Sequence, residues 1–282
     1  MILHEKLLSE TDLKSELQAF LNDSYVWQQA DQRKVIQSML MHIGSVDSEL
    51  RDGLIYGTFY TMILEKNLLD HAILRDTLDY CLTNLLGKGI GEDNSDSVFT
   101  RTFTLLLISL IVAKDNKVDF VEAHKIEELT NKLIKYLLAE KDVRGYVPVK
   151  GWAHSVAHAS DAVDELVKSP KFKKASFMDI LRPLWNMMLQ TNHAFIHDED
   201  ERLLVPIFTM LEQGLQQQEV ITLLNETVEM MAAQKTQLDV QHYRILRFNW
   251  KTLLKSFYIK TAHSPQYAAL HQSVVDCLNI DK

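Results

Sequence analysis

The chain has 282 residues with a formal net charge of −8, and only nine of its residues are glycine and five proline. These 14 residues are about 5% of the chain, against roughly 12% in an average protein. They are too few for the many tight turns of a β-sandwich, a β-barrel or a glycine-rich nucleotide-binding sheet. The negative charge disfavours non-specific binding to nucleic acid or to an anionic membrane surface.

The cysteines and the apolar runs indicate the cellular compartment of the protein. Cys81 and Cys277 are isolated from each other and fit a reducing environment, and the N-terminus lacks the basic and apolar segments of a signal peptide. The most apolar run, residues 105–113, is about nine residues long, whereas a membrane-spanning helix needs about 20. We therefore expect a cytoplasmic protein without a membrane-spanning segment.

Apolar residues recur every three or four positions along most of the chain, which is the period of a helix. This period predicts about twelve helices, over residues 11–21, 25–43, 47–66, 70–86, 98–114, 119–140, 153–168, 176–192, 199–214, 217–234, 239–261 and 265–279. Asp70 is positioned to cap the fourth helix. The fifth helix is apolar nearly all round, so we expect it at the centre of the fold.

Helices of this length joined by short loops pack as αα-hairpins. We predict one all-α domain over residues 1–282, built as a HEAT- or armadillo-like curved solenoid whose repeats are degenerate, since no sequence repeat has a fixed period. A closed α/α-toroid has the same helix count and is the alternative. Toroid enzymes usually carry long active-site loops, and this chain has little loop to spare.

Five of the nine glycines fall in two loops, residues 87–97 and 142–151. These loops lead into the segments 96–101 and 154–161, which carry unusual polar patterns. We therefore expect function where the chain departs from simple helix stacking.

The helix after the second loop carries the most distinctive pattern, Gly151-Trp-Ala-His-Ser-Val-Ala-His-Ala-Ser-Asp. At about 100° per residue, a helical stripe would hold His154, His158, Asp161 and Glu165, opposite a stripe of valines. Two histidines four residues apart with a carboxylate can bind zinc or another divalent metal, or form a histidine base oriented by an aspartate. The same pattern fits a polar pocket without metal, or a solvated helix face. We predict no specific cofactor, and His154, His158 and Asp161 are the metal candidates.

Charged residues elsewhere extend the candidate site. Arg101 lies in an otherwise apolar helix and needs a carboxylate partner, which Asp142, Asp161 or Glu201 could supply. The candidate binding residues are Asp96, Arg101, Asp142, Arg144, Trp152, His154, His158, Asp161, Glu201 and Arg202. The acidic residues that follow His197 are explained by the helix dipole, and the spacing of His193 and His197 is expected by chance among eleven histidines.

Four of these segments together resemble a bacterial family, domain of unknown function 2785, over roughly residues 50–205. The resembling segments are Asp96-Ser-Val-Phe-Thr-Arg101, Glu140-Lys-Asp-Val-Arg-Gly-Tyr146, Lys150-Gly-Trp-Ala-His-Ser-Val-Ala-His-Ala-Ser-Asp161 and Glu199-Asp-Glu-Arg-Leu203. The resemblance implies a cytoplasmic, all-helical bacterial protein with no established activity and no assigned catalytic residue. It also implies that the four segments belong to one site.

Two functions remain open from the sequence. The first is a binding or scaffold module, whose groove of His154, His158, Asp161 and Arg101 receives a protein, a peptide or a small anionic ligand. The second is a hydrolase-type enzyme, with a histidine base, Asp161 as its orienting group and Arg101 or Arg144 stabilising an anion. A nucleic-acid-binding solenoid would need a basic concave face, and the one basic run, residues 168–174, fits a solvated loop.

Overall fold

The computed structural model describes residues 7–24 and 32–280, and it is all-α. Helix accounts for 73% of the structure and strand for 1%, which confirms the predicted fold class. The elements are α1 (Glu10–Leu21), α2 (Gln32–Met41), η2 (Glu49–Tyr56), α3 (Gly57–Tyr60), η3 (Thr61–Glu65), α4 (His71–Tyr80), η4 (Cys81–Leu85), α5 (Ser97–Val118), α6 (Ala123–Ala139), β1 (Tyr146–Val147), β2 (Gly151–Trp152), α7 (Ser155–Lys168), η5 (Lys174–Ser176), α8 (Phe177–Met187), α9 (Glu199–Glu212), α10 (Gln217–Gln237), α11 (Val240–Thr261), η6 (Pro265–Tyr267) and α12 (Ala268–Ile280). Residues 25–31 of the predicted second helix lie outside the described residues.

The helices follow the predicted elements, and side-chain caps fix several of their starts. Asp70 accepts a hydrogen bond from the backbone N–H of Ile73, so it is the N-cap of α4 as predicted. Asp239 caps α11 in the same way. The predicted helix over residues 47–66 is continuous but contains two π-helical segments, η2 and η3, on either side of α3.

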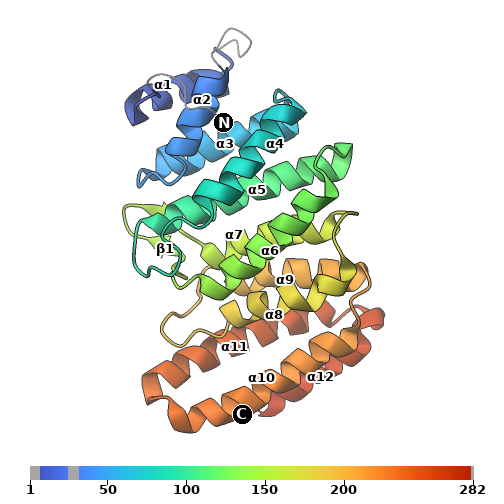
Figure 1. Ribbon diagram of the computed structural model, residues 1–282. Coiled ribbons are helices and arrows are strands. Elements are labelled where there is room, and N and C mark those ends of the chain that lie inside the picture. The colour runs from blue at the N-terminus through green and yellow to red at the C-terminus, as the bar shows by residue number, and fades with distance from the viewer. Residues whose placement is uncertain (1–6, 25–31, 281–282) are drawn as a thin grey trace.

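The elements are stacked in chain order along the long axis of the molecule, with α1 at one end and α12 at the other (Figure 1). In the middle of this stack, α7 packs between α5 and α9. A single large core of aliphatic and aromatic side chains runs through the described helices.

Helix α5 lies at the centre, as its apolar sequence predicts. Every residue from Val98 to Val112 is buried. By length and composition α5 is long and apolar enough to cross a membrane, which the run of about nine residues did not indicate. However, 83% of its most apolar window is buried inside the fold, as in the core helix of a soluble protein.

Helix α7 differs from its prediction in two ways. His154 is not part of the helix but precedes it as the N-cap residue, with a left-handed backbone (φ 50°). On the face opposite the valines, His158 is buried while Asp161 and Glu165 are half-buried, so this face is not fully solvated. His154 thus lies outside the helix, but its ring stays 5.9 Å from that of His158, so the predicted stripe is kept in part.

A small β-hairpin precedes α7 and was not predicted. Its strands pair Tyr146 with Trp152 and Val147 with Gly151. The turn between them holds Val149 in a left-handed conformation (φ 69°), with 94% of its side chain exposed. Strands of two residues are too short to produce an alternating pattern in the sequence.

Candidate metal centre

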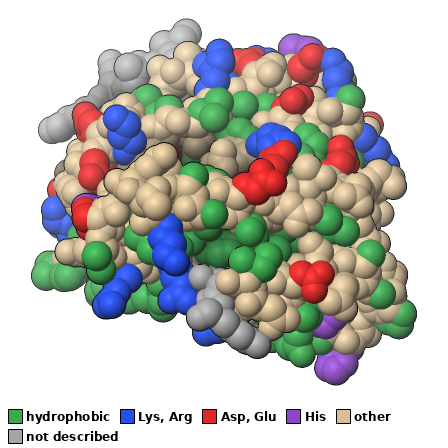
Figure 2. Space-filling model, turned by 90° about the horizontal axis from the view of Figure 1, so that it is seen from below, with side chains coloured by type: hydrophobic (Ala, Val, Ile, Leu, Met, Phe, Trp, Pro, Cys, Tyr) green, Lys and Arg blue, Asp and Glu red, His purple; other side chains and the backbone are tan. Residues whose placement is uncertain are grey.

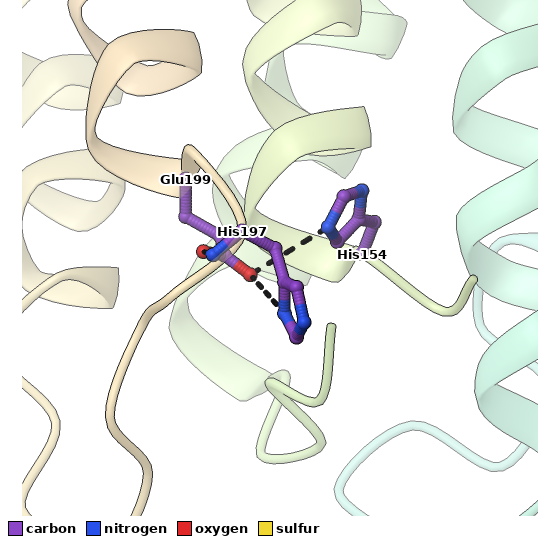
Figure 3. A group of neighbouring side chains, drawn as sticks. All are labelled: His154, His197 and Glu199. Carbon is purple, nitrogen blue, oxygen red and sulfur yellow. Dashed lines mark hydrogen bonds and ion pairs between the residues drawn. The ribbon is translucent and has the colours of Figure 1, made fainter. Parts of the chain in front are cut away.

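Three side chains from the starts of α7 and α9 converge beside the hairpin. They are His154, His197 and Glu199, and one ligand atom from each lies within 4.8 Å of the other two (Figure 3). His154 Nε2 lies 3.6 Å from Glu199 Oε1, and His197 Nδ1 lies 3.8 Å from the same oxygen. Two imidazole nitrogens and one carboxylate oxygen thus face a common space.

Backbone contacts on both sides hold these side chains in place. The N–H of His154 donates to the carbonyl oxygen of Arg144 (2.9 Å), which ties the N-cap of α7 to the loop before β1. On the other side, the buried side chain of Asn249 in α11 accepts from the N–H of Phe195 and donates to the carbonyl oxygen of His193. These bonds anchor the loop that carries His197, so the fold sets the position of the His197 ring.

The three converging atoms have no hydrogen-bond partner among the described residues, although all three are buried. The separations of 3.6 and 3.8 Å are too long for hydrogen bonds. The other oxygen of Glu199, Oε2, does accept a bond from the backbone N–H of His197 (2.8 Å), so the carboxylate is oriented. A buried polar atom without a partner costs about 1–3 kcal/mol. One bound cation would satisfy all three atoms.

Gly145 has no side chain, and the side chains of the cluster occupy the space next to it. A Cβ atom at this position would lie 2.8 Å from Glu199 Oε1 and closer still to His197 Nδ1, which is nearer than side chains tolerate. The glycine here is needed for space, since its own φ is not in the left-handed region. Glycine in the loop 142–151, which the sequence marked as a functional loop, is thus part of the site.

Trp152 forms an aromatic wall next to two of the candidate ligands. Its ring centroid lies 4.3 Å from that of His154 and 5.1 Å from that of His197. Tyr146 packs edge-on against the other side of the indole, with centroids 5.0 Å apart.

The electrostatics of the site keep His154 neutral. Burial lowers the pKa of His154 to about 4, and the nearby His197 and Arg202 lower it further. Burial also lowers the pKa of His193. A metal ion binds only the neutral form of imidazole, so His154 is in the metal-binding form at neutral pH.

Two of the residues predicted as metal candidates have other surroundings. His158 is buried, packs edge-on against Phe103, and burial holds its pKa well below the usual range. Asp161 forms an ion pair with Arg202 on α9 rather than orienting a histidine. The proposed pair of a histidine base and Asp161 is therefore not assembled.

Arg101 does have a carboxylate partner, but the three predicted partners were wrong. It forms a fully buried bidentate pair with Glu140 and also donates to the carbonyl oxygens of Lys88 and Gly89. Asp142 instead pairs with Arg144. Because Arg101 is completely buried, it does not line a groove with the histidines.

The remaining candidate residues lie around this cluster rather than in it. Asp96 pairs with Lys150 at the hairpin. Glu201, in the first turn of α9, is exposed. Among the predicted binding residues, the structure brings His154, Trp152 and His158 together.

A buried arginine that the sequence did not single out supports the hairpin. Arg51 is fully buried and donates to the carbonyl oxygens of Ser45, Lys150 and Trp152. Its guanidinium also stacks over the ring of Phe99, 4.2 Å from the centroid. Burial lowers the pKa of Arg51 to about 10, and the residue stays charged at neutral pH.

Two of the three candidate ligands, His197 and Glu199, were missed. The histidine was set aside as a chance spacing, and the glutamate was explained by the helix dipole. The order of the helices could have indicated both residues. Because α8 lies between them in the chain, α7 and α9 run in the same direction, so the residues that precede α7 and those that precede α9 lie at the same end of the helix pair. Gly145 and His154 lie before one helix, and His197 lies before the other.

Hollows at the other end of the molecule carry different chemistry. One, of about 460 Å³, lies between α10, α11 and the end of α12; it is lined by Lys235, Leu238, Val240, Tyr243, Arg244, Arg247 and Ile280. Viewed from this end, the surface shows a hollow with hydrophobic side chains beside lysine and arginine side chains (Figure 2). It has no histidine, cysteine or carboxylate in its lining, so the His154 cluster is the better candidate for chemistry.

Comparisons with known proteins place the chain in a family. Neither the curated proteins nor the solved structures gave a match. A family model matches residues 86–259, which is more than half of the chain and includes His154, His197 and Glu199. The protein therefore belongs to the family described as protein of unknown function (DUF2785).

Proposed function

We propose that this protein binds one divalent transition-metal ion through His154, His197 and Glu199. The observation that carries the proposal is the convergence of three buried ligand atoms, each without a hydrogen-bond partner among the described residues. Neutral His154 next to a buried carboxylate oxygen leaves polar atoms without partners, which is unfavourable unless a cation binds. A bound ion turns this arrangement into a stabilising one.

The donor set favours zinc. Two imidazoles and one carboxylate suit zinc and other first-row transition metals better than magnesium or calcium, which prefer all-oxygen sites. Structural zinc sites usually have four protein ligands, whereas catalytic sites have three and keep one position for water or substrate. The proposed centre is of the three-ligand type, which supports a hydrolytic function in which the metal activates a bound water.

The helical stack provides the frame for this centre. We propose that it is a degenerate HEAT- or armadillo-like solenoid, supported by the agreement between chain order and spatial order in Figure 1. Two free, buried cysteines, Cys81 and Cys277, support the cytoplasm as its compartment.

Metal stoichiometry tests the proposal directly. The full chain is stripped of metal, dialysed against Zn²⁺ or Co²⁺ and assayed by elemental analysis, with His197→Ala and Glu199→Gln alongside. We expect about one ion per chain in the wild type and a strong loss of binding in both variants. His124→Ala removes an exposed histidine of α6 and is the matched control, which should bind like the wild type.

Absence of bound metal in the wild type, at a concentration that saturates ordinary zinc sites, would refute the proposal. Equal binding by the wild type and both ligand variants would also refute it, since the ion would then be held elsewhere.

A further inference from the structure

We infer that the metal centre binds a ligand with two parts. One part is an acyl-type group that coordinates the metal, and the other is an aromatic or apolar side group that packs against Trp152 and Tyr146. This inference rests on the proposed metal site and adds the chemical class of its ligand. It comes from the aromatic wall beside the cluster and from the pairing of the surrounding charges.

The aromatic wall reaches from the candidate ligands to the surface. Trp152 contacts the rings of both His154 and His197 and is itself only partly buried. Tyr146 continues the wall outward, packed edge-on against the indole with half of its side chain exposed. A ligand atom on the metal would therefore have an aromatic surface next to it, with an exposed edge where a side group can lie.

Three acidic side chains around the cluster are already paired with basic ones. Asp161 pairs with Arg202, Asp142 with Arg144 and Asp96 with Lys150. These pairs neutralise Arg202, Arg144 and Lys150, and the exposed Asp198 next to His197 adds negative charge, so the surroundings do not attract a highly anionic ligand.

A divalent ion held by a single carboxylate leaves one net positive charge at the metal. One acidic donor, such as a carboxylate, a hydroxamate or the oxyanion formed by attack on an acyl group, balances it. Specificity for the rest of the ligand then comes from apolar contact, which favours aromatic and aliphatic acyl compounds over phosphorylated ones.

Hydroxamates test this class, because they bind metals through one acidic group and can carry different side groups. The full chain is loaded with Co²⁺, whose visible spectrum reports a new ligand, and titrated with acetohydroxamate and with benzohydroxamate. Each affinity is divided by the affinity of the same hydroxamate for aqueous Co²⁺. We expect benzohydroxamate to bind about tenfold more tightly after this correction. Tenfold is about 1.4 kcal/mol, which burial of roughly 56 Å² of apolar surface supplies at about 25 cal/mol per Å².

Two variants locate the contact. Tyr146→Ala shortens the aromatic wall without touching a candidate ligand, and it should reduce the preference to threefold or less while Co²⁺ still binds. Tyr258→Ala is the matched control: this half-exposed tyrosine of α11 packs on His271 of α12 and should keep the full preference.

The outcomes separate the two proposals. If Co²⁺ binds but the two hydroxamates are equal after correction, the ligand class is wrong and the metal site stands. If the preference survives in Tyr146→Ala, the aromatic wall is not the contact and the inference is overturned. If Co²⁺ does not bind at all, both proposals fall together.

Discussion

The substitution Gly145→Ala should remove metal binding while leaving the fold intact. The new Cβ would lie 2.8 Å from Glu199 Oε1 and closer to His197 Nδ1, so both side chains must move. An ordinary contact for a Cβ is 3.4–4 Å, so the displacement is at least several tenths of an ångström for the carboxylate and larger for the imidazole. Metal–ligand distances are tolerated only within about 0.2 Å.

The two effects of this substitution differ in size. Overpacking costs typically about 1–3 kcal/mol, and we expect the low end, near 1 kcal/mol, because the crowded atoms are side-chain ends that can turn away. Disturbing the surroundings of a metal ligand typically costs 10–100-fold in metal affinity. Since two ligands are displaced here, we expect a loss of at least about 100-fold.

Competition with a chromophoric chelator measures the zinc affinity, and unfolding in urea measures the stability separately. Gly53→Ala is the control: a Cβ there meets nothing within 4 Å, and the residue lies in a helix, so this variant should be unchanged in zinc affinity and more stable by roughly 0.5–1 kcal/mol. If Gly145→Ala bound zinc as tightly as the wild type, the space left by Gly145 would not serve a metal centre.

Three further predictions follow from buried and strained residues. Without metal, the free energy of unfolding should fall as pH drops from about 6.5 toward 4, by up to about 1.4 kcal/mol per pH unit for one histidine, because the unfolded chain binds a proton that folded His154 (pKa about 4) does not bind. Urea midpoints at pH 7, 6 and 5 measure this fall, and an equally steep slope in His154→Asn would contradict the prediction. Glu140→Ala should cost about 3–5 kcal/mol in urea unfolding, because it leaves the buried Arg101 without its counter-ion; a loss under 1 kcal/mol would show that the pair is not buried in solution. Val149→Gly should raise stability by up to about 1 kcal/mol, because it relieves a left-handed β-branched residue whose side chain is almost fully exposed; a lowered melting temperature would count against this.

The helices could be predicted from the sequence because they depend on local patterns. The apolar period located α5 and its burial, and the side chain of Asp70 capped α4 as its position suggested. The hairpin before α7 escaped because its strands are too short to carry a pattern. Two of the residues of the 142–151 loop, Gly145 and Gly151, were correctly placed where the chain departs from regular helix stacking.

The site could be predicted only in part because its geometry is set by tertiary contacts. Treating His154 as a helical residue put it in a stripe with Asp161, but His154 precedes α7 with a left-handed backbone, and Asp161 pairs with Arg202 instead. His197 and Glu199 join it only because α7 and α9 lie side by side. Similarly, Arg101 pairs with Glu140 just after the end of α6, a contact that sequence spacing does not reveal.

Arg51 has a practical consequence for work on this family. It lies outside the matched residues 86–259, yet its guanidinium holds the carbonyl oxygens of Lys150 and Trp152, which frame the hairpin beside His154. A chain trimmed to the matched residues would lose this donor and uncover the ring of Phe99 on which it stacks. Domain boundaries taken from the family match alone would therefore produce a fragment with a damaged centre, and a negative metal-binding result on such a fragment would say nothing about the whole protein.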